Sequence, residues 1–263
     1  MNEPSSPPLP DVIPHRRLCL AADVEKYSRL DTRTQSAIQA DLVRLLDEAA
    51  TLTGLDRAAW ARQPQGDMEF AVLPADTPEA TVLGPFVHHL SACLSTLNAR
   101  PENPRIRLRL AIDAGVATDA TLGHAGPAPV AVARYANAPQ LKAVLAALTS
   151  ADLVVMVSDR LYQDVVRFGH PSLDPAQYVR AHVQVKEFGG YGWIRVPGHG
   201  PDGIRPVVEE VSEPLPLPQA AVHSRANISQ HVHQGAAVGG DVSGGVNVGV
   251  PMMPPSAGPW RVW

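Results

Sequence analysis

The order of strand-like and helix-like segments between Arg16 and Val196 is the feature that most constrains the fold of this chain. Short apolar or alternating runs, which are typical of strands, are interleaved with segments whose apolar residues recur at helical spacing. The order reads β-α-β-β-α-β-α-β-α-β-β. Because such helices bury their apolar faces against a sheet, the sequence predicts an α+β domain with helices packed on a sheet.

The bounds of these segments follow from apolar periodicity and from the residues that interrupt it. Asp31 or Thr32 begins the first predicted helix, and Gly54 ends it. The other helices cover about 79–98, 130–148 and 159–167, and Gly84-Pro85 should kink the helix at 79–98. The last hairpin is predicted to turn at 188–190. The strands cover 16–23, 58–63, 68–73, 106–116, 153–158, 179–185 and 191–196.

Proline and glycine divide the chain into a domain and its flanking segments. Residues 1–14 are rich in proline and serine and are expected to be disordered, and residues 15–198 form the predicted domain. Residues 199–226 are expected to be an extended, mobile, proline-rich linker. Residues 227–263 form a low-complexity tail that alternates β-branched residues with glycine and small polar residues.

The composition argues against several classes of function. A net charge of −4 over 263 residues gives no reason to expect nucleic acid as a partner. The apolar run at 153–157 is far shorter than a membrane span, and the N-terminus lacks the blocks of a signal peptide. We therefore expect a cytoplasmic protein with no membrane partner. Cys19 and Cys93 lie in apolar runs and are expected to be buried, reduced thiols.

Two aspartates follow or precede predicted strands in positions that suit a metal ion. Asp23 ends the first strand, and Asp67 lies in the turn before the strand 68–73. A pair of carboxylates can hold Mg²⁺ or Mn²⁺ against the phosphates of a ligand. An acid after a strand also often caps a turn, and this interpretation stays open for each residue taken alone.

Segments in a fixed order carry a resemblance to a known family. Over residues 16–198 the chain resembles the catalytic domain of class III adenylate and guanylate cyclases, and is most similar to a divergent actinobacterial branch of that family. The matching segments are residues 22–28 around Asp23, Gly66-Asp67, 112–115, the stretch from Gly126 to Arg134, and Val185-Lys186.

The resemblance implies a ferredoxin-like, antiparallel-rich sheet and a homodimer whose sites form between protomers. It also implies a nucleoside triphosphate or related phosphorylated ligand, bound with Mg²⁺ or Mn²⁺. In this family Asp23 and Asp67 would hold the metal. Arg134 would be the catalytic residue that neutralises charge on the α-phosphate, and Lys186 would bind the terminal phosphates. Gln63 stands where a lysine reads the base.

The chain departs from the family's pattern at positions that the reaction needs. Val130 replaces an asparagine that orients the ribose. Gln63 and Gly123 occupy the two base-reading positions, and Glu187 replaces the glycine that usually follows the late lysine. Loss of one transition-state group costs about 10²–10³ in rate. We therefore expect a nucleotide-binding pseudoenzyme with weak or no turnover. The alternatives are an active cyclase with altered base choice and an interaction module that binds no ligand.

Polar residues in the predicted domain also have purely structural interpretations. Arg134 would equally fit a surface ion pair, and Lys186 a charge at a strand edge. Glu69 alternates with apolar neighbours and is expected to be solvated. His124 lies in the glycine-rich turn near the predicted site and could contact a phosphate, although a loop histidine usually has no role. The solvated interpretation also applies to a row of arginines on one face of the strand 106–116: Arg105, Arg107 and Arg109.

The tail has two interpretations of equal weight. It resembles the amyloid-signalling motifs at the termini of bacterial immune and cell-death proteins, through which a sensor templates an effector protein. Its glycine content fits a flexible linker just as well. On the first interpretation the protein acts in signalling or defence through its tail.

Overall fold

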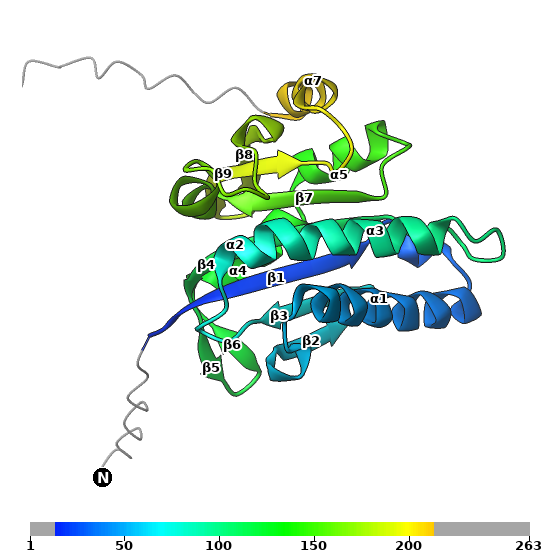
Figure 1. The fold of residues 1–263 in the computed structure, drawn as a ribbon, viewed down its shortest axis with the longest axis horizontal. Helices are drawn as coiled ribbons and strands as arrows, with labels where there is room; N and C mark the ends of the chain where they lie inside the picture. Colours follow the sequence, from blue (N-terminus) through cyan, green and yellow to red (C-terminus); the bar gives the residue numbers. More distant parts are fainter. Residues whose placement is uncertain (1–13, 213–263) are drawn as a thin grey trace, which may run out of the picture. The chain divides into compact units, whose positions relative to one another are not determined.

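The computed structural model describes residues 14–212 (Figure 1). Nearly all of the predicted N-terminal segment 1–14 and the whole of the predicted tail 227–263 lie outside the described residues. The described range is an α+β domain, as predicted.

A seven-stranded sheet forms the centre of the described domain, in the order β2-β3-β1-β4-β7-β9-β8. Neighbouring strands are antiparallel except β4 and β7, which are parallel. The predicted antiparallel-rich sheet is therefore confirmed. The strands are β1 (Arg16–Val24), β2 (Ala61–Gln65), β3 (Met68–Val72), β4 (Leu108–Val116), β7 (Leu153–Ser158), β8 (Val179–Val185) and β9 (Phe188–Arg195), and a separate hairpin pairs β5 (Thr118–Ala120) with β6 (Gly123–Ala125).

Helices cover both faces of the sheet. On one face, α1 (Thr32–Thr53) and α3 (Val87–Asn98) bury one set of alternate strand residues, including Leu20, and Figure 1 shows both helices running along β1. On the opposite face, α4 (Pro127–Ala136), α5 (Pro139–Ala147) and α7 (Pro201–Val211) cover the other set, including Ala21. The remaining α-helices of the described domain are short: α2 (Glu79–Thr81) and α6 (Asp159–Leu161). No helix within residues 14–212 combines the length and the apolar character that crossing a bilayer requires.

The residues predicted to begin and end α1 do so. Asp31 Oδ1 accepts a hydrogen bond from the Thr34 backbone N–H at 2.9 Å, which satisfies one of the unpaired donors at the helix start. Gly54 adopts the left-handed conformation, with φ of 77°, and terminates the helix. Cys19 and Cys93 are buried free thiols, as predicted.

The predicted kink at Gly84-Pro85 takes the form of a π-helical turn. This turn covers Val82–Phe86 and joins α2 to α3, so that residues 79–98 run as one interrupted helix. Proline lacks the N–H that would continue the regular helical pattern, which accounts for the wider turn at this point. A side chain at Gly84 would overlap Ser172, so the helix can approach this loop only through glycine.

Several predicted segments differ from the structure in their bounds, including the strand predicted at 58–63, which is β2 at 61–65 after a 3₁₀ turn at 57–59. Residues 130–148 form two helices, because the chain leaves the helical conformation at Ala138, directly before Pro139. A residue before proline is disfavoured in the α conformation. The last hairpin turns at Lys186-Glu187 rather than at 188–190, since Val185 pairs with Phe188. Lys186 adopts φ of 55° to make this tight turn.

The segment predicted as the start of an extended linker is partly helical. Residues 201–211 form α7, in which Ile204 and Val208 are buried against the α4–α5 face of the sheet. Pro201 at the first helical position needs no N–H donor, and the spacing of Ile204 and Val208 places both on one side. The domain therefore extends to the end of α7, and the predicted linker from residue 213 onward lies outside the described residues.

Glu69 is buried, which contradicts its predicted solvated position. Its carboxylate forms a bidentate ion pair with Arg57, at 2.6 Å and 2.9 Å. The two side chains are 5% and 4% exposed, and Arg57 also pairs with Asp47. Arg57 comes from a turn after α1, and a long-range partner of this kind leaves no local signal in the sequence.

Candidate functional site

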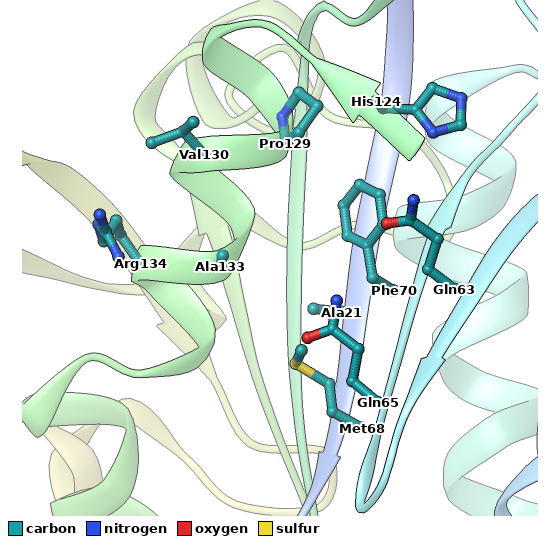
Figure 2. Close-up of a pocket in the computed structure, with 10 residues that line it drawn as sticks. All are labelled: Ala21, Gln63, Gln65, Met68, Phe70, His124, Pro129, Val130, Ala133 and Arg134. Atoms are coloured by element: carbon teal, nitrogen blue, oxygen red, sulfur yellow. The ribbon is translucent and has the colours of Figure 1, made fainter. Parts of the chain in front are cut away.

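An open groove lies between the β2–β3 hairpin and α4, on the face of the sheet that α4 covers (Figure 2). Its base is formed by Ala21 of β1 with Phe70 and Met68 of β3. Gln63 lines one side, and Arg134 lines the opposite side. The groove has a volume of about 270 Å³, slightly below the roughly 300–1,000 Å³ of pockets that enclose small-molecule ligands. The groove by itself is therefore slightly smaller than a typical pocket for a small-molecule ligand.

Helix α4 brings two residues of the predicted site to this groove. Gly126 precedes the helix with φ of 129°, and a side chain there would overlap the backbone of Val116. Val130 and Arg134 are one helical turn apart, so both face the groove. Val130 is 49% exposed and offers no hydrogen bond. An apolar side chain thus stands at the position where a ribose-binding group was expected.

Arg134 is held by a residue that is distant in the sequence, in the β8–β9 turn. Its Nη2 donates to Glu187 Oε1 at 2.8 Å. The Arg134 side chain is 23% exposed, whereas that of Glu187 is 75% exposed. The Nε of Arg134 is buried and has no partner among the described residues. Arg134 therefore forms the predicted surface ion pair, and its Nε–H remains available to a ligand.

Gln63 is the other residue of the predicted site that lines the groove. Its Nε2 donates to the Leu122 carbonyl at 3.3 Å, in the turn between β5 and β6. A side chain at Gly123 would overlap the Gln63 amide. The two positions that the resemblance assigns to base reading are therefore coupled, because the absence of a side chain at 123 makes room for Gln63. Lys186 is exposed in the β8–β9 turn, beside the residue that pairs with Arg134.

His124 lines the groove, although the sequence favoured no role for it over contact with a phosphate. It belongs to β6 rather than to a loop, and its side chain is only 7% exposed. It lines the groove, and its ring centroid lies 6.4 Å from that of Phe70. The glycine-rich turn placed His124 near the predicted site, but its burial depends on Phe70 of a distant hairpin, which no local pattern in the sequence indicates.

The two predicted metal ligands lie together, outside the groove lining. Asp23 is on the same face of β1 as Ala21, and the Asp67 carbonyl accepts a hydrogen bond from the Val24 N–H at 3.0 Å. Burial raises the pKa of Asp23, and the negative charge of Asp67 raises it further, whereas Arg109 lowers it. The structure thus brings the two carboxylates near each other at one end of β1.

Arg109 is bound to Asp23, which contradicts the prediction of a solvated row of arginines. Its Nε donates to Asp23 Oδ2 at 2.6 Å, and the two side chains are 14% and 15% exposed. Arg107 is similarly buried against Glu25 at 2.8 Å. These cations pair with acids because β4 lies directly beside β1, a neighbour that the sequence of β4 alone does not reveal.

The carboxylate oxygens of Asp23 and Asp67 suit a metal ion that binds together with the phosphates of a ligand. No group of three or more histidine, cysteine, aspartate and glutamate side chains gathers anywhere in residues 14–212. Mg²⁺ is often held by one or two carboxylates that share it with substrate phosphates. Arg109 donates a hydrogen bond to one carboxylate oxygen of Asp23, which leaves the other oxygen free to coordinate a metal. The pair therefore suits a metal–phosphate complex better than a permanently bound ion.

The described domain shares the fold of adenylate and guanylate cyclase domains. The crystal structure of an adenylate/guanylate cyclase/hydrolase from Silicibacter pomeroyi matches 71% of this chain and 99% of its own, with a TM-score of 0.51 and 20% sequence identity. That of the guanylyl cyclase Cya2 matches 72% and 95%, with a TM-score of 0.50 and 12% identity. No protein-family model and no curated protein matches the sequence.

Proposed function

We propose that this domain binds a nucleoside triphosphate or a related phosphorylated ligand and has weak or no cyclase turnover. The observation that carries the proposal is the groove that Gln63 and Arg134 both line, together with an Arg134 N–H that has no partner among residues 14–212. A guanidinium is well suited to phosphate because its planar donors match phosphate oxygens. An apolar base with a few converging polar groups is typical of a small-molecule site.

Weak turnover is supported by the groups that surround the same groove. Val130 gives no hydrogen bond to a ribose, and positioning is most of what phosphoryl chemistry requires of a protein. Arg134 is paired with Glu187, and Asp23 is paired with Arg109. Each pairing competes with the contacts that a triphosphate and its metal would make. The domain on this proposal is a ligand sensor rather than an efficient enzyme.

Mg²⁺ or Mn²⁺ is the metal that this proposal requires, held by Asp23 and Asp67. When bound, such an ion neutralises phosphate charge and activates a hydroxyl group. Arg134 and Lys186 would contribute positive charge to the phosphates from the side of α4 and the β8–β9 turn. Gln63 would contact the rest of the ligand from the β2 side.

We also propose that the domain works as a homodimer, as the resemblance implies. The groove is open, and two exposed apolar side chains lie beside it: Leu122 at 96% exposure and Val130 at 49%. A second copy over this face would cover them and enlarge the binding surface. That the tail recruits an effector protein remains a further prediction, and it concerns residues outside the described range.

The test is to incubate the purified protein with each of the four ribonucleoside triphosphates and Mg²⁺ or Mn²⁺. Binding is measured by calorimetry and products by mass spectrometry. We expect metal-dependent binding without appreciable cyclic product, and loss of binding in the Asp67→Ala variant. Asp67 is a better choice than Asp23, because removing Asp23 would leave Arg109 buried without its partner.

The main alternative is an active cyclase that makes a 3′,5′-cyclic nucleotide with unusual base choice. It is favoured by the presence of Asp23, Asp67, Arg134 and Lys186 together. A cyclic product that disappears in Asp67→Ala would establish it. Absence of any triphosphate binding by the wild-type protein would refute both functions and leave the interaction module that binds no ligand.

Freeing Arg134 from Glu187 should strengthen ligand binding. We expect Glu187→Gln to raise the affinity for a triphosphate by about two- to fivefold, because exposed ion pairs are worth about 0.2–1 kcal/mol. Titration calorimetry at fixed salt measures the change. Glu209→Gln removes the same charge from an exposed position on α7 and should leave the affinity unchanged. Equal gains in both variants would show that only net charge matters.

A further inference from the structure

The buried imidazole of His124 is a polar group for which the domain supplies no hydrogen bond. Both ring nitrogens are inaccessible to solvent and have no hydrogen-bond partner among the described residues. Asp119 Oδ1 comes within 3.1 Å of Nε2 but not in hydrogen-bond geometry, and the Asp119 side chain is 89% exposed. Buried polar groups are nearly always hydrogen-bonded, and leaving one unpaired costs about 1–3 kcal/mol. A bound ligand is one way to satisfy this group.

The surroundings of His124 suit the flat ring of a ligand rather than its phosphates. Phe70 lies beside it, with ring centroids 6.4 Å apart. The Gln63 amide is fixed by its hydrogen bond to the Leu122 carbonyl, which leaves Oε1 to accept a hydrogen bond. Figure 2 shows Gln63, Phe70 and His124 on one side of the groove and Arg134 on the other. The cationic group and the ring-binding groups therefore occupy different sides.

A neutral imidazole offers one donor and one acceptor. The hydrogen-bonding edge of a nucleobase likewise presents donors and acceptors next to each other. The Gln63 Oε1 adds a second acceptor from the neighbouring strand, and Phe70 adds an aromatic surface. Together these groups match a planar nitrogen heterocycle.

We propose that His124 contacts the heterocyclic ring of the ligand and helps to determine which base is accepted. This inference rests on the proposed function, because it assigns one part of the same ligand. On this proposal Arg134 holds the phosphate end and His124, with Gln63, holds the ring end. Since both ring nitrogens are buried in this structure, the imidazole must turn toward the groove for His124 to contact the ligand directly.

The experiment compares nucleoside triphosphates with inorganic tripolyphosphate, which carries the phosphates but no ring. The key variant is His124→Phe, which keeps a ring of similar size and removes both nitrogens. His124→Ala is the second variant, and His88→Ala is the control, because His88 is exposed on α3 at the opposite face of the sheet. Binding is measured by calorimetry in the full-length protein, and thermal melting checks that each variant is folded.

We expect His124→Phe and His124→Ala to weaken the best-bound nucleoside triphosphate about tenfold, as for loss of one hydrogen bond that leaves a polar group unpaired. Binding of tripolyphosphate should not change, and the control should behave as wild type. The imidazole nitrogen signals of wild-type His124, followed by NMR, should shift when the nucleotide is added and not when tripolyphosphate is added.

Wild-type affinity in His124→Phe would overturn the proposal, since a ring without nitrogens would then suffice. Equal loss for nucleotide and tripolyphosphate would also overturn it, because His124 would then serve the phosphates or the fold. If the wild-type protein binds tripolyphosphate as tightly as every nucleotide, the ring assignment fails while anion binding stands. If it binds neither, the proposed function itself fails.

Discussion

Replacing Glu69 with alanine is expected to lower the free energy of unfolding by about 3–5 kcal/mol. The substitution leaves Arg57, which is only 5% exposed, without its bidentate partner. A buried charge that loses its buried counter-ion cannot recover its hydration, and the remaining partner of Arg57 is Asp47, whose side chain is 51% exposed, so the native state bears the cost. Urea denaturation measures the loss, with Trp60 as the fluorescent reporter, since its ring centroid lies 5.5 Å from the Arg57 guanidinium.

The matched control for this prediction is the exposed ion pair between Arg16 and Glu79. Their side chains are 47% and 25% exposed, so Glu79→Ala should cost no more than about 1 kcal/mol. A double variant, Arg57→Met with Glu69→Leu, should regain most of the stability, because a well-packed apolar pair often replaces a buried ion pair without loss. A cost for Glu69→Ala as small as that of the control would contradict the buried ion pair.

Arg134→Ala is expected to weaken triphosphate binding by about 10- to 100-fold and to leave stability nearly unchanged. Hydrogen bonds to charged groups are worth about 1.5–3 kcal/mol, which corresponds to this range of affinity. The fold should tolerate the change, because the only ion pair lost is with the 75% exposed Glu187. Calorimetric titration with a triphosphate measures the affinity, and a urea transition at the wild-type midpoint verifies the fold.

Arg205→Ala is the control for Arg134, because it removes one exposed positive charge on α7. It should bind the triphosphate as the wild type does. Tripolyphosphate should lose affinity for Arg134→Ala to the same extent as the nucleotide, since the arginine is assigned to the phosphates. Undiminished affinity in Arg134→Ala would remove the residue from the site and with it the main support for ligand binding in this groove.

Local patterns in the sequence were enough to locate most of the fold. The order of strands and helices, the Asp31 start and the Gly54 end of α1, and the interruption at Pro85 each depend on residues within one segment. Hydrophobic periodicity and capping act over a few residues, so they can be read without knowledge of the neighbours. Pro139 is a similar local signal, and it divides the predicted helix 130–148 into α4 and α5.

The candidate site could be predicted only in part. Asp23, Asp67, Gln63, Arg134 and Lys186 were selected through a family resemblance, and their roles remain predictions. The structure assigns Gln63 and Arg134 to one groove and the two aspartates to the adjacent end of β1. The partners of these residues could not be predicted, because each comes from a segment far away in the sequence.

The sequence by itself determined the order of most strands and helices and the α+β class, because both depend on the local spacing of apolar residues. Only the tertiary structure decided which charges are paired. The pairing of β1 with β4 brings Arg109 to Asp23, the turn after α1 brings Arg57 to Glu69, and the β8–β9 turn brings Glu187 to Arg134. Burial of a charged side chain or of the His124 ring depends on tertiary packing, because the segments that cover it are distant in the sequence and meet only in the folded domain.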